Sequence, residues 1–222
     1  MVLKGKVINF LGDSITAGSG VSSPDKIYCS LLMKNAELKA ANNYGIGGTR
    51  FAIQKGTDFR PKDDFVDLNS FSERFDIMDE NADMVVVFGG TNDYGHGDAP
   101  LGSFEDRTPD TFYGACHYLF SGLIKKFLGK PIIIMTPLHR VGEMNTKRED
   151  KAYEFGTLRD YVEIIREVAE YYSLPILDMY KVSGLQPEIA EIKSKYVPDG
   201  LHPNDDGHVI IADKLQKFLE QL

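Results

Sequence analysis

Three short runs of continuous apolar residues constrain the fold of this chain more than any other feature. Residues 7–11, 84–88 and 132–135 are rich in valine and isoleucine and hold almost no polar side chains. Strands with this pattern are buried on both faces, as in a parallel sheet that helices cover on each side. Residues 175–177 and a segment near 42–44 are weaker candidates of the same kind. We therefore expect a parallel sheet of about five strands.

Amphipathic helical patterns separate these runs. The clearest apolar face recurs at the spacing of one helix side and comprises Leu158, Tyr161, Val162, Ile165, Val168, Ala169 and Tyr172. The last helix repeats this pattern from Ile211 onward, and Asn204 is its expected N-cap. Thr108, Pro109 and Asp110 are expected to open another helix. The alternation predicts a three-layer α/β/α fold, a doubly wound flavodoxin-like arrangement, as a single domain over residues 1–222.

The remaining stretches contain few regular patterns. Residues 54–69, 94–107 and 139–154 are rich in glycine, proline and charged side chains, and are expected to be surface loops that can shape a pocket. Cys29 and Cys116 fall in helical patterns and are expected to be buried free thiols. His208 is expected to be a packed or capping residue on the apolar side of the last helix, and His117 to lie on the surface of its helix.

The charge balance narrows the partners that this chain can bind. The formal net charge is -8, and no run of basic residues exceeds a pair, which argues against nucleic acid as a ligand. The first eleven residues read as a strand rather than a secretory leader, so a cytoplasmic location is expected. No apolar stretch approaches the roughly 20 residues of a membrane helix, so no membrane partner is expected. The oligomeric state stays open.

Polar, glycine-bearing turns follow the expected strands. They are Gly12-Asp13-Ser14 after the first strand, residues 43–48 after the second and residues 89–93 after the third. Residues 199–204 precede the last helix and place a carboxylate and an imidazole three positions apart. Ligands of open α/β sheets bind at the carboxyl ends of the strands, so these turns are expected to meet in one site.

The residue types in these turns match the requirements of nucleophilic catalysis. A serine hydroxyl needs a base to remove its proton, and the base needs a carboxylate that holds its tautomer. Ser14, His202 and Asp199 can take these three roles. The oxyanion of a tetrahedral intermediate needs N–H donors, for which the Ser14 amide, the Gly48 amide and the Asn92 side chain are candidates.

The four turns together resemble the GDSL or SGNH hydrolases, a family named for the Ser, Gly, Asn and His of four short blocks. The resemblance extends from about residue 7 to the final helix and implies Ser14 as nucleophile with Asp199 and His202 as its partners. It also implies an oxyanion hole formed by Gly48 and Asn92. Many members place a threonine one position later than Thr49, which leaves Gly47 as an alternative to Gly48.

Five polar residues near the expected site are candidates for contact with substrate. They lie beside the motif residues or in the loops that follow the third and fourth strands, and they are Asp13, Arg50, Tyr94, His96 and His139. Asp93 is expected to cap a loop rather than to react.

The expected function is hydrolysis of a carboxylic ester through an acyl-enzyme, with no cofactor and no metal. The polar loops favour a small-molecule ester with a short acyl group such as acetyl, carried by a carbohydrate. One alternative is a metal-dependent phosphoesterase that uses Asp13, Asp93, Asp199 and His202. Another is a non-catalytic flavodoxin-like module that binds a small anionic ligand. The chain lacks the G-x-S-x-G sequence of an α/β-hydrolase elbow.

Overall fold

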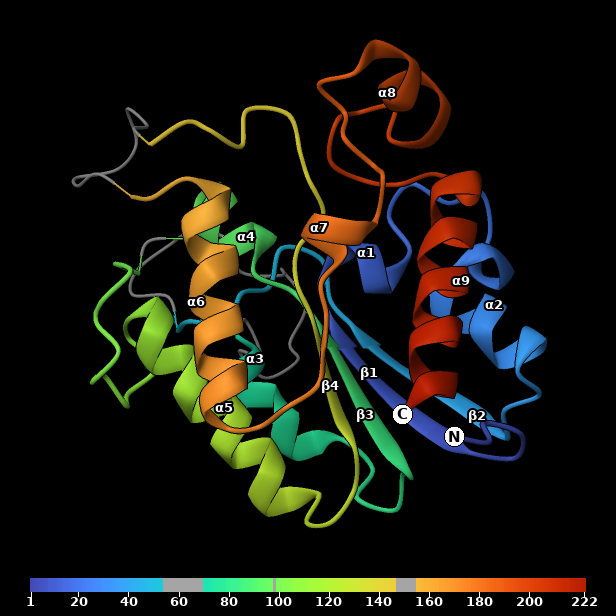
Figure 1. Ribbon diagram of the computed structural model, residues 1–222, viewed down its shortest axis with the longest axis horizontal. Helices are drawn as coiled ribbons and strands as arrows, with labels where there is room; N and C mark the ends of the chain where they lie inside the picture. The colour runs from blue at the N-terminus through green and yellow to red at the C-terminus, as the bar shows by residue number, and fades with distance from the viewer. Residues whose placement is uncertain (54–69, 98, 147–154) are drawn as a thin grey trace, which may run out of the picture.

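One all-parallel sheet runs through the centre of the protein (Figure 1). The structure, a computed structural model, describes residues 1–53, 70–97, 99–146 and 155–222, so the loop expected at 54–69 lies outside the described residues. The strand order is β2-β1-β3-β4-β5. The strands are β1 (Val7–Gly12), β2 (Ala40–Gly45), β3 (Met84–Phe88), β4 (Ile132–Met135) and β5 (Ile176–Leu177). The expected parallel sheet is confirmed.

Helices cover both faces of this sheet (Figure 1). The longer ones are α2 (Tyr28–Asn35), α5 (Phe112–Lys126), α6 (Leu158–Tyr171), α8 (Ala190–Tyr196) and α9 (Asp205–Gln221). The short ones are α1 (Ser14–Ala17), α3 (Phe71–Arg74), α4 (Thr91–His96), α7 (Met179–Val182) and the 3₁₀ turns η1 (Pro24–Lys26) and η2 (Phe75–Ile77). The pair α5 and α6 packs on one face, and α2 and α9 pack on the other. This arrangement is the expected three-layer fold.

Strand β3 shows why its sequence is continuously apolar. Val85 and Val87 join the core beneath α5 and α6, whereas Met84, Val86 and Phe88 join the core beneath α2 and α9. Successive side chains of a strand point to opposite faces, so a strand covered on both sides needs an apolar residue at every position.

Two helix starts were expected, and one of them is wrong. The Asn204 side chain accepts a hydrogen bond from Gly207 N at 3.1 Å, which confirms it as the N-cap of α9. Helix α5 begins at Phe112, not at residue 108, because the Thr111 side chain accepts from Gly114 N and caps the helix there. Pro109 lies in the preceding turn, where its carbonyl accepts from Ile53 N.

Two expectations of surface exposure are also corrected. His117 is only 1% exposed, because its ring packs against the rings of Phe104 and Tyr171. The stretch expected as a loop from residue 94 begins inside α4, and Tyr94 is buried. The two cysteines are free and buried and His208 is buried, as expected.

The carboxyl ends of the strands meet at one edge of the sheet, beside α1, α4 and α7 (Figure 1). The chain continues from β1 to β2 on one side and returns to β3 on the other, so the β1/β3 boundary is the topological switch point where ligands bind in such folds. The two termini lie at the opposite edge, where the Met1 ammonium donates to the Glu220 carbonyl at 2.7 Å.

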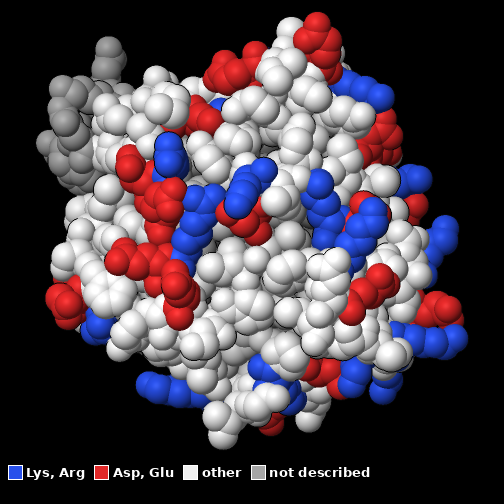
Figure 2. All heavy atoms as spheres, viewed as in Figure 1, with Lys and Arg blue, Asp and Glu red and all other residues white. Residues whose placement is uncertain are grey.

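The surface carries interspersed charges. On the face drawn in Figure 2, acidic and basic side chains alternate without a continuous basic area. On α6, Arg166 pairs with Glu163 at 2.7 Å and with Asp178 at 2.6 Å. Among the described residues, no helix is both long enough and apolar enough to cross a bilayer.

Candidate active site

Ser14 lies directly after β1, as the first residue of α1. Its Oγ is 3.0 Å from Nε2 of His202, although the two residues are 188 positions apart in the chain. The turn into α1 requires a glycine before it, because a Cβ on Gly12 would lie 1.8 Å from Oγ1 of Thr16. The close packing of this turn brings the serine to the edge of the sheet.

His202 connects Ser14 to a carboxylate. Its Nδ1 lies 2.7 Å from Oδ2 of Asp199, and Oδ1 of Asp199 accepts from the main-chain N–H groups of Leu201 and His202. An acceptor at Nδ1 holds the ring proton there, so Nε2 has a lone pair for the Ser14 hydroxyl. Burial opposes ionisation of Asp199, but these hydrogen bonds outweigh it and hold the pKa of the carboxyl below its usual value.

The turn that carries His202 is held from both sides. Gly200 accepts from Val141 N at 2.9 Å, and Asn204 N donates to the carbonyl of Tyr196. Gly20, in the segment after α1, lies so close that a Cβ there would be 2.4 Å from the Pro203 carbonyl oxygen. Sequence analysis did not identify Gly20, because its contact partner is distant in the chain.

We expect Gly20→Ala to lower kcat for ester hydrolysis about 10- to 100-fold, since the new Cβ would also lie 3.1 Å from Cβ of His202 and displace the ring. Its positive φ of 95° adds about 1–2 kcal/mol of strain. Gly129→Ala is the matched control, because Gly129 has φ 77° and open space around it. Both variants should lose stability in chemical denaturation, but only Gly20→Ala should lose kcat. Equal kcat in the two variants would contradict the prediction.

Main-chain N–H donors lie in the turns that follow β1 and β2. Among the described residues, the main-chain N–H groups of Ser14, Gly47 and Gly48 have no hydrogen-bond partner. Gly47 lies against the serine, and a Cβ there would be 3.8 Å from Cβ of Ser14. Asn92 is the second residue of α4, and its Nδ2 donates to the Thr49 carbonyl at 3.0 Å. N–H groups of these kinds can donate to an oxyanion.

A buried arginine that sequence analysis missed lies behind these donors. Nη2 of Arg74 donates to the Gly12 carbonyl at 2.5 Å and to Oγ1 of Thr49 at 2.8 Å, and its Nη1 donates to the Tyr44 carbonyl. Arg74 thereby ties the ends of β1 and β2 to the glycine turn. The sequence held one indication of its burial: Arg74 lies three positions after the apolar Phe71, so in a helix the two side chains share one side.

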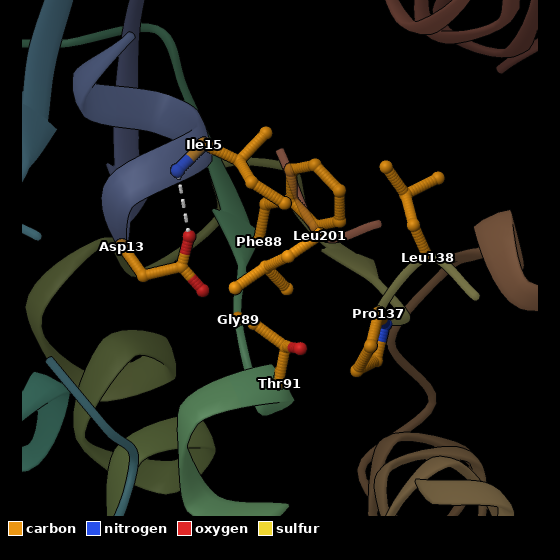
Figure 3. A pocket seen from close by; sticks show the side chains of 8 residues that line it. All are labelled: Asp13, Ile15, Phe88, Gly89, Thr91, Pro137, Leu138 and Leu201. Atoms are coloured by element: carbon orange, nitrogen blue, oxygen red, sulfur yellow. Dashed lines mark hydrogen bonds between the residues drawn. The ribbon is translucent and has the colours of Figure 1, made fainter. Parts of the chain in front are cut away.

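Asp13 is the N-cap of α1 and is 1% exposed. Its Oδ1 accepts from Ile15 N at 3.0 Å, and its carboxyl lines a gap between packed side chains that has no room for a water molecule (Figure 3). The other lining residues are mostly apolar: Ile15, Phe88, Gly89, Thr91, Pro137, Leu138 and Leu201. Burial raises the pKa of Asp13 to about 6, although the Ile15 N–H and the positive charge of Arg74 partly oppose this.

The raised pKa of Asp13 predicts a pH-dependent cost to stability. The folded state binds the proton more tightly than the unfolded state, so stability is lost as pH rises from 3.8 through about 6. The difference between these two pKa values corresponds to a loss of about 3 kcal/mol in the free energy of unfolding at neutral pH. In Asp13→Asn the amide oxygen can still accept from Ile15 N, so the variant should exceed the wild type by less than about 1 kcal/mol at pH 4 and by up to about 3 kcal/mol at pH 8. Urea denaturation across this range tests the prediction, which a pH-independent difference would contradict.

The other expected substrate contacts are directed largely at the protein itself. Arg50 is 2% exposed, and its Nη1 lies 2.8 Å from Nδ1 of His96. Tyr94 donates from its hydroxyl to the Gly142 carbonyl. The His139 ring packs against that of Tyr180 with 3.9 Å between ring centroids and a tilt of 34°. None of these contacts reaches Ser14.

Two carboxylates of the alternative metal site, those of Asp13 and Asp93, accept hydrogen bonds from main-chain N–H groups. Asp93 accepts from Phe51 N and Ala52 N at 3.0 Å each, as its expected capping role requires, and burial raises its pKa to about 7. Among the described residues, no three His, Cys, Asp or Glu side chains gather as metal ligands do. The acidic side chains at the strand ends therefore do not converge on one point.

Comparison with known proteins assigns the chain to a class. A model of the GDSL-like lipase/acylhydrolase family matches residues 10–210. A solved structure of a protein from Lactobacillus plantarum is 32% identical, with a TM-score of 0.80 and coverage of 98% of each chain. The fold and the family match define a hydrolase of the SGNH type. The chain belongs to the GDSL-like lipase/acylhydrolase family.

Two more distant structures share the fold. An acetyl xylan esterase is 22% identical with a TM-score of 0.64, and the match covers 95% of this chain and 98% of that one. A two-domain esterase active on acetylated mannans is 19% identical with a TM-score of 0.63, and the match covers 97% of this chain and 48% of that one. A comparison with curated proteins finds no match.

Proposed function

We propose that this protein is a serine esterase in which Ser14 is the nucleophile, His202 the general base and Asp199 the group that orients the base. The observation that carries the proposal is the continuous line from the Ser14 hydroxyl through the imidazole to the carboxylate, with separations of 3.0 and 2.7 Å. Membership of a hydrolase family supports it independently. We also propose that residues 1–222 act as a single domain.

The first half-reaction forms an acyl-enzyme. Oγ of Ser14 bonds to the ester carbonyl carbon while its proton passes to Nε2 of His202. The resulting oxyanion accepts hydrogen bonds from the Ser14 amide, the Gly47–Gly48 turn and Nδ2 of Asn92. The contact of Gly47 with Ser14 favours the Gly47 amide over that of Gly48. The intermediate collapses, the bond to the alkoxy oxygen breaks, and the imidazolium returns its proton to the leaving alcohol.

The second half-reaction releases the acid. Water gives a proton to Nε2 of His202 and attacks the acyl carbon, and the same donors hold the second oxyanion. The bond to Oγ of Ser14 then breaks, and the serine recovers its proton from the imidazolium. No step requires a cofactor.

We propose a short acyl group, such as acetyl, as the one transferred, with a carbohydrate ester as the substrate class. The loops that the sequence places near the site are polar, and the sequence holds no long apolar segment that could cover a longer acyl chain. The named activities of the xylan and mannan esterases agree with this choice, although both proteins are distant.

The direct test is hydrolysis of p-nitrophenyl acetate with and without EDTA, together with labelling by a fluorophosphonate. We expect turnover that EDTA does not change and a single phosphonylated residue, which peptide mass mapping places at Ser14. Loss of turnover in EDTA, with no label on Ser14, would instead support the metal-dependent phosphoesterase.

The lack of a long apolar lid segment in the sequence predicts a limit on acyl length. We expect kcat/KM for p-nitrophenyl esters to fall about 10-fold or more between acetate and octanoate, because the sequence offers a longer chain no apolar lid to pack against. A series of acetate, butyrate, octanoate and palmitate esters measures the dependence. Efficient cleavage of the palmitate ester would contradict the prediction.

A further inference from the structure

We propose that His96 is a positioning residue that fixes the orientation of the Asn92 carboxamide and so aims its N–H at the oxyanion. The inference rests on the proposed function, because it concerns the same donor set. It gives His96 and Arg50 a role other than the substrate contact expected from the sequence.

His96 and Asn92 lie one turn apart on α4, so their side chains share a face of the helix. Nε2 of His96 is 3.1 Å from Oδ1 of Asn92, and Nδ1 of His96 is 2.8 Å from Nη1 of Arg50. A guanidinium can only donate, so Nδ1 must accept. The ring proton therefore sits on Nε2 and is donated to Oδ1 of Asn92.

This donation selects one of two amide orientations. With the carbonyl of Asn92 turned toward His96, the amide nitrogen faces the Thr49 carbonyl and donates to it at 3.0 Å. The flipped amide would set N–H against N–H at His96 and carbonyl against carbonyl at Thr49. Because one amide proton goes to Thr49, the second remains for the oxyanion.

Arg50 is held in place to support the imidazole. It is 2% exposed, and the next two residues of its segment donate their main-chain N–H groups to Asp93, the residue that follows Asn92. The guanidinium and the carboxamide thus bind opposite sides of the same ring. A chain of hydrogen bonds thus leads from Arg50, just after the glycine turn, through His96 to Asn92, the proposed oxyanion donor.

Two amide substitutions separate the contacts of His96. In His96→Gln the longer side chain places an N–H where Nε2 lies and can still donate to Asn92. In His96→Asn the shorter side chain places its carbonyl near Nδ1, so it can accept from Arg50 but does not reach Asn92. We expect His96→Asn to lower kcat for p-nitrophenyl acetate about 10- to 100-fold, below the about 10²- to 10³-fold cost of losing a donor. KM should change less than about threefold, and His96→Gln should recover most of kcat.

A double-mutant cycle links the effect to Asn92. In an Asn92→Ala background, His96→Asn should lower kcat by less than about threefold, since the group that it positions is gone. An undiminished loss in that background would overturn the proposal, and so would equal kcat in the Asn and Gln variants. Thermal unfolding of each variant identifies any loss that comes from instability.

The tautomer can be measured in the unaltered protein. Nitrogen-15 NMR of the histidine rings should show the His96 proton on Nε2, and a proton on Nδ1 would overturn the inference without any variant. This readout is independent of the proposed function. If Ser14→Ala and Asn92→Ala both leave kcat unchanged, the esterase mechanism fails, whereas full activity in His96→Asn alone refutes only the positioning role.

Discussion

Ser14→Ala is expected to reduce kcat for p-nitrophenyl acetate about 10⁴- to 10⁶-fold, the range found when a triad nucleophile is removed. The reason is that no acyl-enzyme can form without Oγ, whereas the donors around the site still bind the ester. KM should therefore change little. Steady-state rates measured on protein of verified fold, with the hydrolysis rate in buffer subtracted, give the comparison.

The matched control for this variant is Ser19→Ala, because Ser19 is exposed and lies just after α1. Its kcat should equal that of the wild type. If Ser14→Ala keeps more than about a tenth of the activity, hydrolysis does not proceed through this serine.

Asp199→Asn is expected to lower kcat about 10²- to 10³-fold. An asparagine that turns its NH₂ group to Nδ1 would force the ring proton onto Nε2, where it blocks proton transfer from Ser14. We expect a smaller effect than the about 10⁴-fold known for a buried triad aspartate, because the Asp199 side chain is 54% exposed and water can replace part of its interaction.

Asp206→Asn provides the control, since Asp206 is an exposed carboxylate in the first turn of α9. It changes the net charge equally, so any common loss would reflect charge and not geometry. An Asp199→Asn variant with kcat within about threefold of this control would show that His202 needs no orienting carboxylate.

Strands β3 and β4 could be predicted to the residue because burial on both faces leaves a local trace, an uninterrupted apolar run. The start of α5 could not, since Pro109 and Thr111 both suit a helix entrance and a contact of the Pro109 carbonyl with Ile53 determines which is used. The exposure of His117 was wrong for a similar reason, because Phe104 covers it from a separate segment.

The candidate site shows the same division. Ser14, Asn92 and His202 could be proposed because short blocks that are weak signals alone occur together and in order along the chain. Arg74 and Gly20 could not, since a guanidinium that binds three strand and turn groups, or a glycine that touches Pro203, has no meaning until distant segments meet.

The sequence by itself determined the parallel sheet, the order of its helices and the residue types available for acyl transfer, because each depends on neighbours along the chain. Only the tertiary structure decided that Oγ of Ser14 lies 3.0 Å from Nε2 of His202, and that Nε2 of His96 lies 3.1 Å from Oδ1 of Asn92. Those facts depend on distances and proton positions between groups from separate elements. Hydrophobic patterning selects a fold, but hydrogen-bond geometry across the sheet edge sets what each side chain can do.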